Sequence, residues 1–229
     1  PPWSPAKGND DVLRICCVVS VCVPGIESNP GLVSDAAITA QINQMNEHFR
    51  NNNPRGGQFA TGSRWAARDS GDTKIEFYWV PGDTNTRRNK NFSSGTAIGI
   101  YNDNGKHMKT SEGGIDPADP SKYCNIYIVD GNLSNGGPSG WAGGPSVGNP
   151  TDGMTCLWQA WVGNPCRNNA AGVFTGPGAN TMVHEAGHYL GLPHTWGPEK
   201  VGVDQCVLDD YGIADTPPQD GPGTVGVCM

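Results

Sequence analysis

Three histidines and one glutamate stand close together in the run HEAGHYLGLPH. In a helix, His184 and His188 lie one turn apart and project from the same face, so both imidazoles can reach one metal ion. Glu185 follows the first histidine and can point at a water molecule on that ion. Gly191 can take the left-handed conformation that ends a helix, which turns the chain back and brings His194 to the same ion. The pattern H-E-x-x-H-x-x-G-x-x-H therefore predicts a zinc site.

The ligand set suits hydrolysis. Three neutral imidazoles leave the ion its positive charge and an open position for water. The metal lowers the pKa of that water to roughly 7, and Glu185 can take its proton as the water attacks a peptide carbonyl. Glu185 can then pass the proton to the leaving amine. The alternative is an amphipathic core helix with satisfied histidines, but three of the chain's five histidines fall in this run, which favours the metal.

The first elements that must support this site are a strand and a helix. Residues 12–23 form a continuous β-branched run, which is typical of a buried central strand. Ser34 can cap a helix that follows, because apolar residues recur there at spacings of four, three and four and form one stripe. These apolar residues are Ile38, Ile42, Met45 and Phe49. They predict a helix that packs on the core and has no direct part in the chemistry.

Further elements complete a layered domain. Residues 74–80 and 125–129 read as strands, and residues 96–101 form a weaker candidate. Glycine and proline dominate residues 131–178, where we expect loops and short rim strands. Asn180 or Thr181 can then cap the helix of the zinc motif, which is expected to run to about Leu190. The order predicts an α/β (α+β) fold with a mixed sheet.

The extended zinc motif resembles that of the metzincin clan of zinc endopeptidases. Other segments narrow the resemblance to the pappalysin family. They are LVSDAAITAQINQMNEHFR at 32–50, TKIEFYWV at 73–80, KYCNIYIVDG at 122–131, GWAGGP at 140–145, HTWG at 194–197, Cys206, Asp209-Asp210 and Asp215-Thr216-Pro217. The resemblance implies a metzincin-like catalytic domain with a twisted mixed sheet, a backing helix and a zinc-site helix. It also implies a secreted endopeptidase that acts on proteins or peptides, with Glu185 as general base.

One element of the family is missing from the sequence. Metzincins carry a methionine-containing turn beneath the zinc, which pappalysins write N-Y-M-D-Y, and no such run precedes Met229. We therefore expect that the chain ends early, by truncation, proteolysis or an incomplete sequence. An N-terminal catalytic subdomain of residues 1–194 would then be followed by a short, irregular C-terminal part at 195–229. A catalytically impaired, zinc-stabilised binding protein of the same fold is the alternative, against which the intact Glu185 argues.

Acidic residues gather after the zinc motif and suggest a second metal. Hard oxygen ligands on a loop suit Ca²⁺, and the resemblance adds to this, because pappalysins bind calcium in this region. The candidate ligands are Asp209, Asp210, Asp215 and Thr216, with Asp204 nearby. Their spacing matches no EF-hand, so a solvated acidic loop is the alternative.

The segment GWAGGP is the candidate border of a substrate cleft. The resemblance places it where an extended substrate pairs with an exposed sheet edge, and glycines there would let two backbones approach closely. The residues concerned are Gly140, Trp141 and Ala142. An ordinary turn with a packed tryptophan is an equally good reading of these residues.

Composition fits a secreted, loop-rich globular enzyme. The chain has 33 glycines, 19 prolines and only 16% charged residues. A net charge of -7 argues against nucleic acid or an anionic membrane as the partner. No membrane span or signal peptide is visible, and Pro1 in place of a starting methionine suggests a processed mature form. We expect a monomer. Asn91 and Asn132 begin glycosylation acceptor tripeptides if the source is eukaryotic, and unused tripeptides are an equally good reading.

The eight cysteines are an even number without a CxxC pair, which favours disulfides over a second zinc site. Cys206 with Cys228 is the preferred pair, since both lie in the loop-rich tail, and Cys156 with Cys166 is a plausible local closure. Cys16 and Cys17 are adjacent and should face opposite sides of a strand, so they should not share a partner element.

Overall fold

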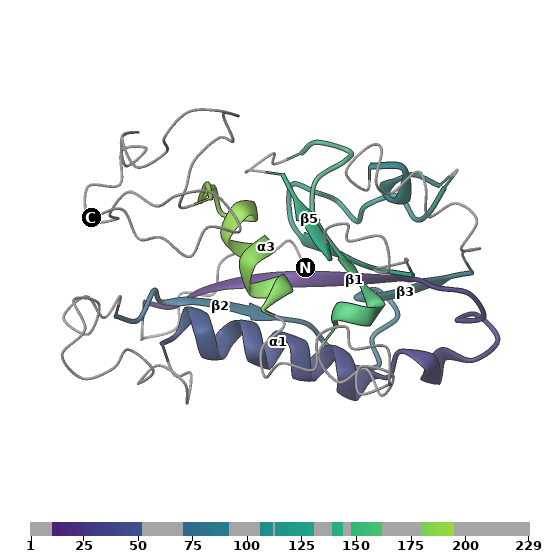
Figure 1. Ribbon diagram of the computed structural model, residues 1–229, viewed down its shortest axis with the longest axis horizontal. Coiled ribbons are helices and arrows are strands. Elements are labelled where there is room, and N and C mark those ends of the chain that lie inside the picture. Colours follow the sequence, from purple (N-terminus) through teal and green to yellow (C-terminus); the bar gives the residue numbers. More distant parts are fainter. Residues whose placement is uncertain are drawn as a thin grey trace, which may run out of the picture.

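One mixed sheet and two α-helices make up the described part of the chain (Figure 1). The computed structural model describes residues 11–51, 71–91, 106–111, 113–130, 139–143, 148–161 and 180–194. The strands are β1 (Leu13–Cys22), β2 (Ile75–Tyr78), β3 (Arg87–Lys90), β4 (Cys124–Val129), β5 (Gly140–Ala142) and β6 (Met154–Leu157). The helices are α1 (Asp35–Phe49) and α3 (Thr181–Tyr189), with 3-10 turns η1 (Pro30–Leu32), η4 (Lys106–Lys109) and η6 (Trp158–Ala160). This arrangement confirms the predicted α/β fold class.

The sheet is built around β1, the strand expected at residues 12–23. The strand order is β2-β1-β4-β6-β5, and β3 also pairs with β1. The strands β2 and β3 pair with successive halves of β1, at Leu13–Cys16 and at Val19–Cys22. All pairings are parallel except that of β5 with β6, which is antiparallel. The sheet is therefore mixed, and β5 is the strand whose direction differs.

The two faces of the sheet bury different sets of side chains. Cys17, Val19 and Val21 of β1 belong to the main core, to which Met182 and Ala186 of α3 and the apolar stripe of α1 also belong. The residues that alternate with these along the strands point to the other face of the sheet, where a smaller cluster forms. That cluster contains Cys22, Met108, Tyr127, Val129 and Leu157. Both helices therefore cover the same face of the sheet, and α3 contacts β5, β6 and α1 there.

Helix α1 begins and packs as its sequence predicts. Ser34 accepts a hydrogen bond from the main-chain N–H of Ala37 at 3.1 Å, which satisfies one donor of the first turn. The stripe faces the core, with Ile38, Ile42 and Met45 buried. Phe49 lies edge-on to Phe77 of β2, with 5.2 Å between ring centroids. The helix therefore supports the sheet from its buried face, against β2 (Figure 1).

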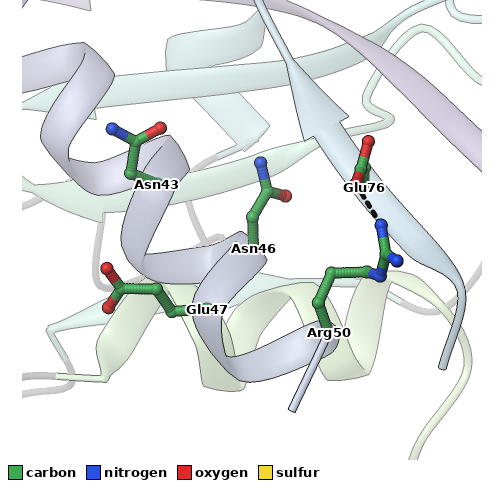
Figure 2. A pocket seen from close by; sticks show the side chains of 5 residues that line it. All are labelled: Asn43, Asn46, Glu47, Arg50 and Glu76. Atoms are coloured by element: carbon green, nitrogen blue, oxygen red, sulfur yellow. Dashed lines mark hydrogen bonds and ion pairs between the residues drawn. The ribbon is translucent and has the colours of Figure 1, made fainter. Parts of the chain in front are cut away.

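Side chains near the end of α1 also bond to the strand β2. Asn46 accepts from the main-chain N–H of Phe77 at 2.7 Å and donates to its carbonyl at 2.8 Å. Arg50 pairs with Asp72 at 2.8 Å and with Glu76, which Figure 2 shows beside it. Five side chains line a shallow pocket of about 290 Å³ here: Asn43, Asn46, Glu47, Arg50 and Glu76. Asn46 and Arg50 bind groups of β2, so the side chains around this pocket link α1 to β2.

Four cysteines of the described strands are buried free thiols, which corrects the expectation of disulfides for these residues. They are Cys16, Cys17, Cys22 and Cys124. Cys17 and Cys124 are in register on neighbouring strands, and the hydrogen bond between their thiols, with burial, raises the pKa of Cys17. These side chains fill space in the sheet, which a count of cysteines cannot reveal. The predicted pairs with Cys166, Cys206 and Cys228 lie outside the described residues.

Several other expectations also fall outside the described residues. These are the weaker strand at 96–101, the acceptor at Asn132 and the C-terminal part from residue 195. Among the residues that are described, no helix has the length and apolarity needed to cross a membrane.

Candidate metal centre

Helix α3 presents the first two histidines of the motif. It begins at Thr181, as expected, and the main-chain N–H of His184 bonds to the carbonyl of Asn180 at 2.8 Å. The helix ends in a reversed turn, because Gly191 has a φ of 98°. The N–H of Leu192 reaches back to the carbonyl of Gly187 at 2.9 Å, which closes this turn. The predicted glycine turn is thus present and sends the chain back towards the helix.

The turn brings the three imidazoles together. The Nε2 atom of His188 lies 3.0 Å from that of His184 and 3.0 Å from that of His194. The Nε2 atoms of His184 and His194 are 3.2 Å apart. Nitrogens bound at about 2.0–2.1 Å to one tetrahedral ion lie roughly 3.3–3.4 Å from each other. The three side chains therefore fit a single zinc ion, and they form the metal-ligand cluster of the described residues.

The protonation of these rings also suits a metal. Nδ1 of His188 lies 2.7 Å from the main-chain carbonyl oxygen of Leu192, which can only accept. Nδ1 therefore carries the proton, and Nε2 is left with a lone pair that faces the other histidines. Burial lowers the pKa of His184, and the nearby His188 and His194 lower it further. The neutral imidazole, which is the form that binds metals, is favoured.

Glu185 is buried beside the ligands without being one of them. Its side chain turns towards β5 and is only 6% exposed. Burial raises the pKa of Glu185 to about 7, against the effect of a hydrogen bond from the main chain of Ala142, which lowers it. A positive ion held by the histidines would also lower this pKa. A carboxyl group with a pKa near neutrality can both accept and release a proton at physiological pH.

The three candidate cleft residues do not all lie on the same side of β5. Gly140 and Ala142 are in register with Cys156 and Met154, which belong to the core beneath the helices. Gly140 lies directly against Thr181 and Glu185 of α3. Trp141 instead packs against the smaller cluster on the opposite face. The structure thus brings Gly140 and Ala142 to the metal centre and makes Trp141 a packing residue of the other face.

A hydrogen bond that sequence reasoning missed holds the end of the zinc helix. The hydroxyl of Tyr189 donates to Oδ2 of Asp152 at 3.2 Å. Asp152 precedes β6 and is 2% exposed, and burial raises the pKa of Tyr189, so the phenol remains a donor. The two residues are far apart in sequence and match no motif. Nothing in their local pattern could have indicated the contact.

The candidate calcium ligands cannot be placed. Asp209, Asp210, Asp215 and Thr216 all lie outside the described residues. Their role stays a prediction.

Comparison with known proteins agrees with this site. The sequence model of the Peptidase_M43 family, described as pregnancy-associated plasma protein-A, matches residues 103–227. A search of curated proteins found no match.

Solved structures of mirolysin from Tannerella forsythia have a similar fold. Mature mirolysin in complex with a cleaved peptide shares 28% identity and a TM-score of 0.68, over 92% of this chain and 73% of that one. A promirolysin mutant also shares 28% identity, with a TM-score of 0.69, over 92% of this chain and 64% of that one. Mirolysin in complex with compound 9 gives 28% identity and a TM-score of 0.63, over 91% and 73% of the two chains. With its family match spanning more than half of its length, this chain belongs to the Peptidase_M43 family of metallopeptidases.

Proposed function

We propose that this chain is a secreted zinc-dependent endopeptidase in which Glu185 is the general base. The observation that carries the proposal is the convergence of three Nε2 atoms, 3.0–3.2 Å apart, beside a buried carboxylate. The family supports metalloprotease activity, and the complex of mature mirolysin with a cleaved peptide supports peptide substrates. The net charge of -7 suits an extracellular protein that does not bind nucleic acid.

Each residue has a distinct part in this proposal. His184, His188 and His194 would hold the zinc, which when bound supplies an electrophile that acidifies water and polarises a peptide carbonyl. The carbonyl of Leu192 orients His188 through its Nδ1 proton. Glu185 accepts a proton from the attacking water on its carboxylate and later delivers it to the leaving amine. Burial near the sheet keeps this carboxylate away from bulk water.

Substrate would lie along β5. Among the described strands, β5 stands at the end of the sheet order with one edge unpaired, to which an extended peptide can add as a further strand. Gly140 and Ala142, which adjoin Glu185, would border the cleft there. Such a surface suits protein and peptide substrates and needs no second copy of the chain, so we propose a monomer.

Calcium completes the proposal as a structural ion. Asp209, Asp210, Asp215 and Thr216 would bind it in the part of the chain that follows the catalytic subdomain of residues 1–194. The ion would act on stability and not on the proton transfers.

The test separates the metal from the base. The zinc-loaded wild type should hold one zinc per chain and cleave a denatured protein substrate, and a chelator should abolish cleavage until zinc is restored. Glu185→Ala should retain the zinc but lose at least about 100-fold in kcat, because the proton acceptor is removed and the ligands remain. Zinc content and peptide cleavage, measured on the same samples, check both statements.

Two results would count against the proposal. A wild type that binds zinc but cleaves nothing would favour the catalytically impaired binding protein instead. A Glu185→Ala variant that cleaves at a near wild-type rate would show that another group is the base.

A further inference from the structure

The absence of a side chain at Gly140 is needed for the position of Glu185. A Cβ atom added to Gly140 would lie 2.7 Å from Cγ2 of Thr181, 2.8 Å from Cγ of Glu185 and 3.0 Å from Oε1 of Glu185. Non-bonded carbon atoms are most stable at about 3.5–4.0 Å, so such contacts cannot be kept without movement. Any larger residue at this position would displace the carboxylate or the helix.

A main-chain group of the same strand fixes the carboxylate from a second direction. Ser139 and Leu157 form a hydrogen-bonded pair, with the N–H of Leu157 donating to the carbonyl of Ser139 at 2.9 Å. Hydrogen-bonded and non-bonded pairs alternate along an antiparallel ladder, so Gly140 and Ala142 turn their main-chain groups away from β6. The outward N–H of Ala142 donates to the carboxylate of Glu185. This donor lies on the edge of β5 that no described strand covers, at the border of the metal centre.

A third contact keeps β5 and α3 in register. The hydroxyls of Ser139 and Thr181 are 3.0 Å apart and share a hydrogen bond at the first residue of the helix. Asn180, which precedes that residue, makes no side-chain capping bond. The start of α3 is thus bonded to the segment that carries Gly140.

We propose that Gly140 and the main-chain N–H of Ala142 are positioning groups that hold the Glu185 carboxylate against β5, at the orientation needed for proton transfer. The proposal rests on the function proposed above, and it gives β5 a task in addition to bordering the substrate. A fixed contact removes the rotamer freedom of the glutamate side chain before the reaction begins. Displacement of a reacting group by about 1 Å can cost on the order of 100-fold in rate.

Two glycine-to-alanine variants test the steric part. Gly140→Ala in the zinc-loaded enzyme should lower kcat by about 10- to 100-fold with KM changed by less than about 3-fold, because the base moves and the substrate edge remains. Zinc affinity, measured by competition with a chelating dye, should stay within about 3-fold of wild type, since the histidines are untouched. Gly82→Ala is the control, because an added Cβ there meets nothing within 4 Å and the residue belongs neither to the metal centre nor to the candidate cleft. It should leave kcat, KM and zinc affinity unchanged.

Amide hydrogen exchange tests the hydrogen bond without any activity measurement. In zinc-loaded Glu185→Ala, the amide of Ala142 should exchange at least about 10-fold faster than in wild type, since it loses its acceptor. The amide of Trp141, which faces β6, should keep its wild-type rate and serves as the internal control. This measurement needs no folded Gly140 variant, so it decides the question even if Gly140→Ala does not fold.

The outcomes separate this proposal from the assignment of function. An unchanged exchange rate at Ala142, or a Gly140→Ala enzyme with wild-type kcat, would overturn the positioning role. A rise in KM alone would assign Gly140 to the substrate edge only and would also overturn it. A wild type without peptidase activity would refute the proposed function, and the exchange rates would still decide whether β5 holds the carboxylate.

Discussion

The main chain of Gly191 has a φ of 98°, in the region that residues with a Cβ adopt at a cost of roughly 1–2 kcal/mol. The turn at this residue separates His188 on the helix from His194 beyond it, and their Nε2 atoms are 3.0 Å apart only because the chain reverses there. We therefore expect Gly191→Ala to disturb His194 more than His184 or His188. Zinc affinity should fall by about 10-fold or more, because one of three ligands loses its fixed position. Competition with a chelating dye would measure this loss.

Substitution of a second glycine separates the effect of local backbone strain from that of damage to the metal site. Gly82 also has a positive φ, of 76°, and an added Cβ there meets nothing within 4 Å. Gly82→Ala should therefore destabilise the fold by a comparable amount, on the order of 1 kcal/mol, and leave zinc affinity at the wild-type value. Equal losses of zinc affinity in both variants would refute the special role of the Gly191 turn.

At the scale of elements, the edge strand β2 depends on α1 for its last hydrogen bonds. Asn46 supplies both a donor and an acceptor to the main chain of Phe77, so it replaces a neighbouring strand. Asn46→Ala should lower the free energy of unfolding by about 1–3 kcal/mol, since it leaves main-chain groups at a partly buried site without partners. Chemical denaturation would measure the change.

Asn43→Ala is the matched control for this prediction, because Asn43 lines the same pocket one turn earlier in the helix (Figure 2). It should change the stability by less than about 0.5 kcal/mol, as exposed helix positions usually do. An Asn46→Ala protein with wild-type stability would show that β2 does not need this side chain.

The elements that could be predicted are those with a strong local pattern. The β-branched run of β1, the capped apolar stripe of α1 and the histidine spacing of α3 each follow from residues a few positions apart. By contrast β3 has the sequence Arg-Arg-Asn-Lys, which carries no apolar alternation, and it is a strand only because β1 offers it a partner. The direction of β5 likewise depends on its pairing with β6.

The same division holds for the metal centre. The types and spacing of His184, His188, His194 and Glu185 predict them as candidate site residues. The groups that orient them could not be, because they are main-chain atoms or distant residues. The carbonyl of Leu192 and the N–H of Ala142 have no sequence signature at all. Tyr189 meets Asp152 only because the sheet brings β6 under α3.

At the scale of the whole molecule, the site joins segments that lie far apart in the chain. Helix α3 carries two of the candidate ligands and the candidate base, and the turn at Gly191 brings the third ligand. Strand β5 contacts the glutamate, and Asp152, just before β6, holds the helix end. Both helices share one core with the central strand β1. A metal that binds only the folded arrangement should therefore stabilise the entire sheet and not the helix alone.

Calcium should act on the same global equilibrium through different residues. If Asp209, Asp210, Asp215 and Thr216 hold Ca²⁺ only in the folded state, a concentration 100-fold above the dissociation constant adds about 2.7 kcal/mol and raises Tm. The double variant Asp209→Asn and Asp210→Asn should lose this rise in Tm and keep its response to zinc. Asp72→Asn is the control, because it alters the ion pair with Arg50 at the end of α1. It should keep both responses. Thermal melts with zinc saturating throughout, in calcium and in a calcium-selective chelator, measure the effect. Superimposable wild-type melts would leave the four residues as a solvated acidic loop, and a calcium response that survives in the double variant would place the ion elsewhere.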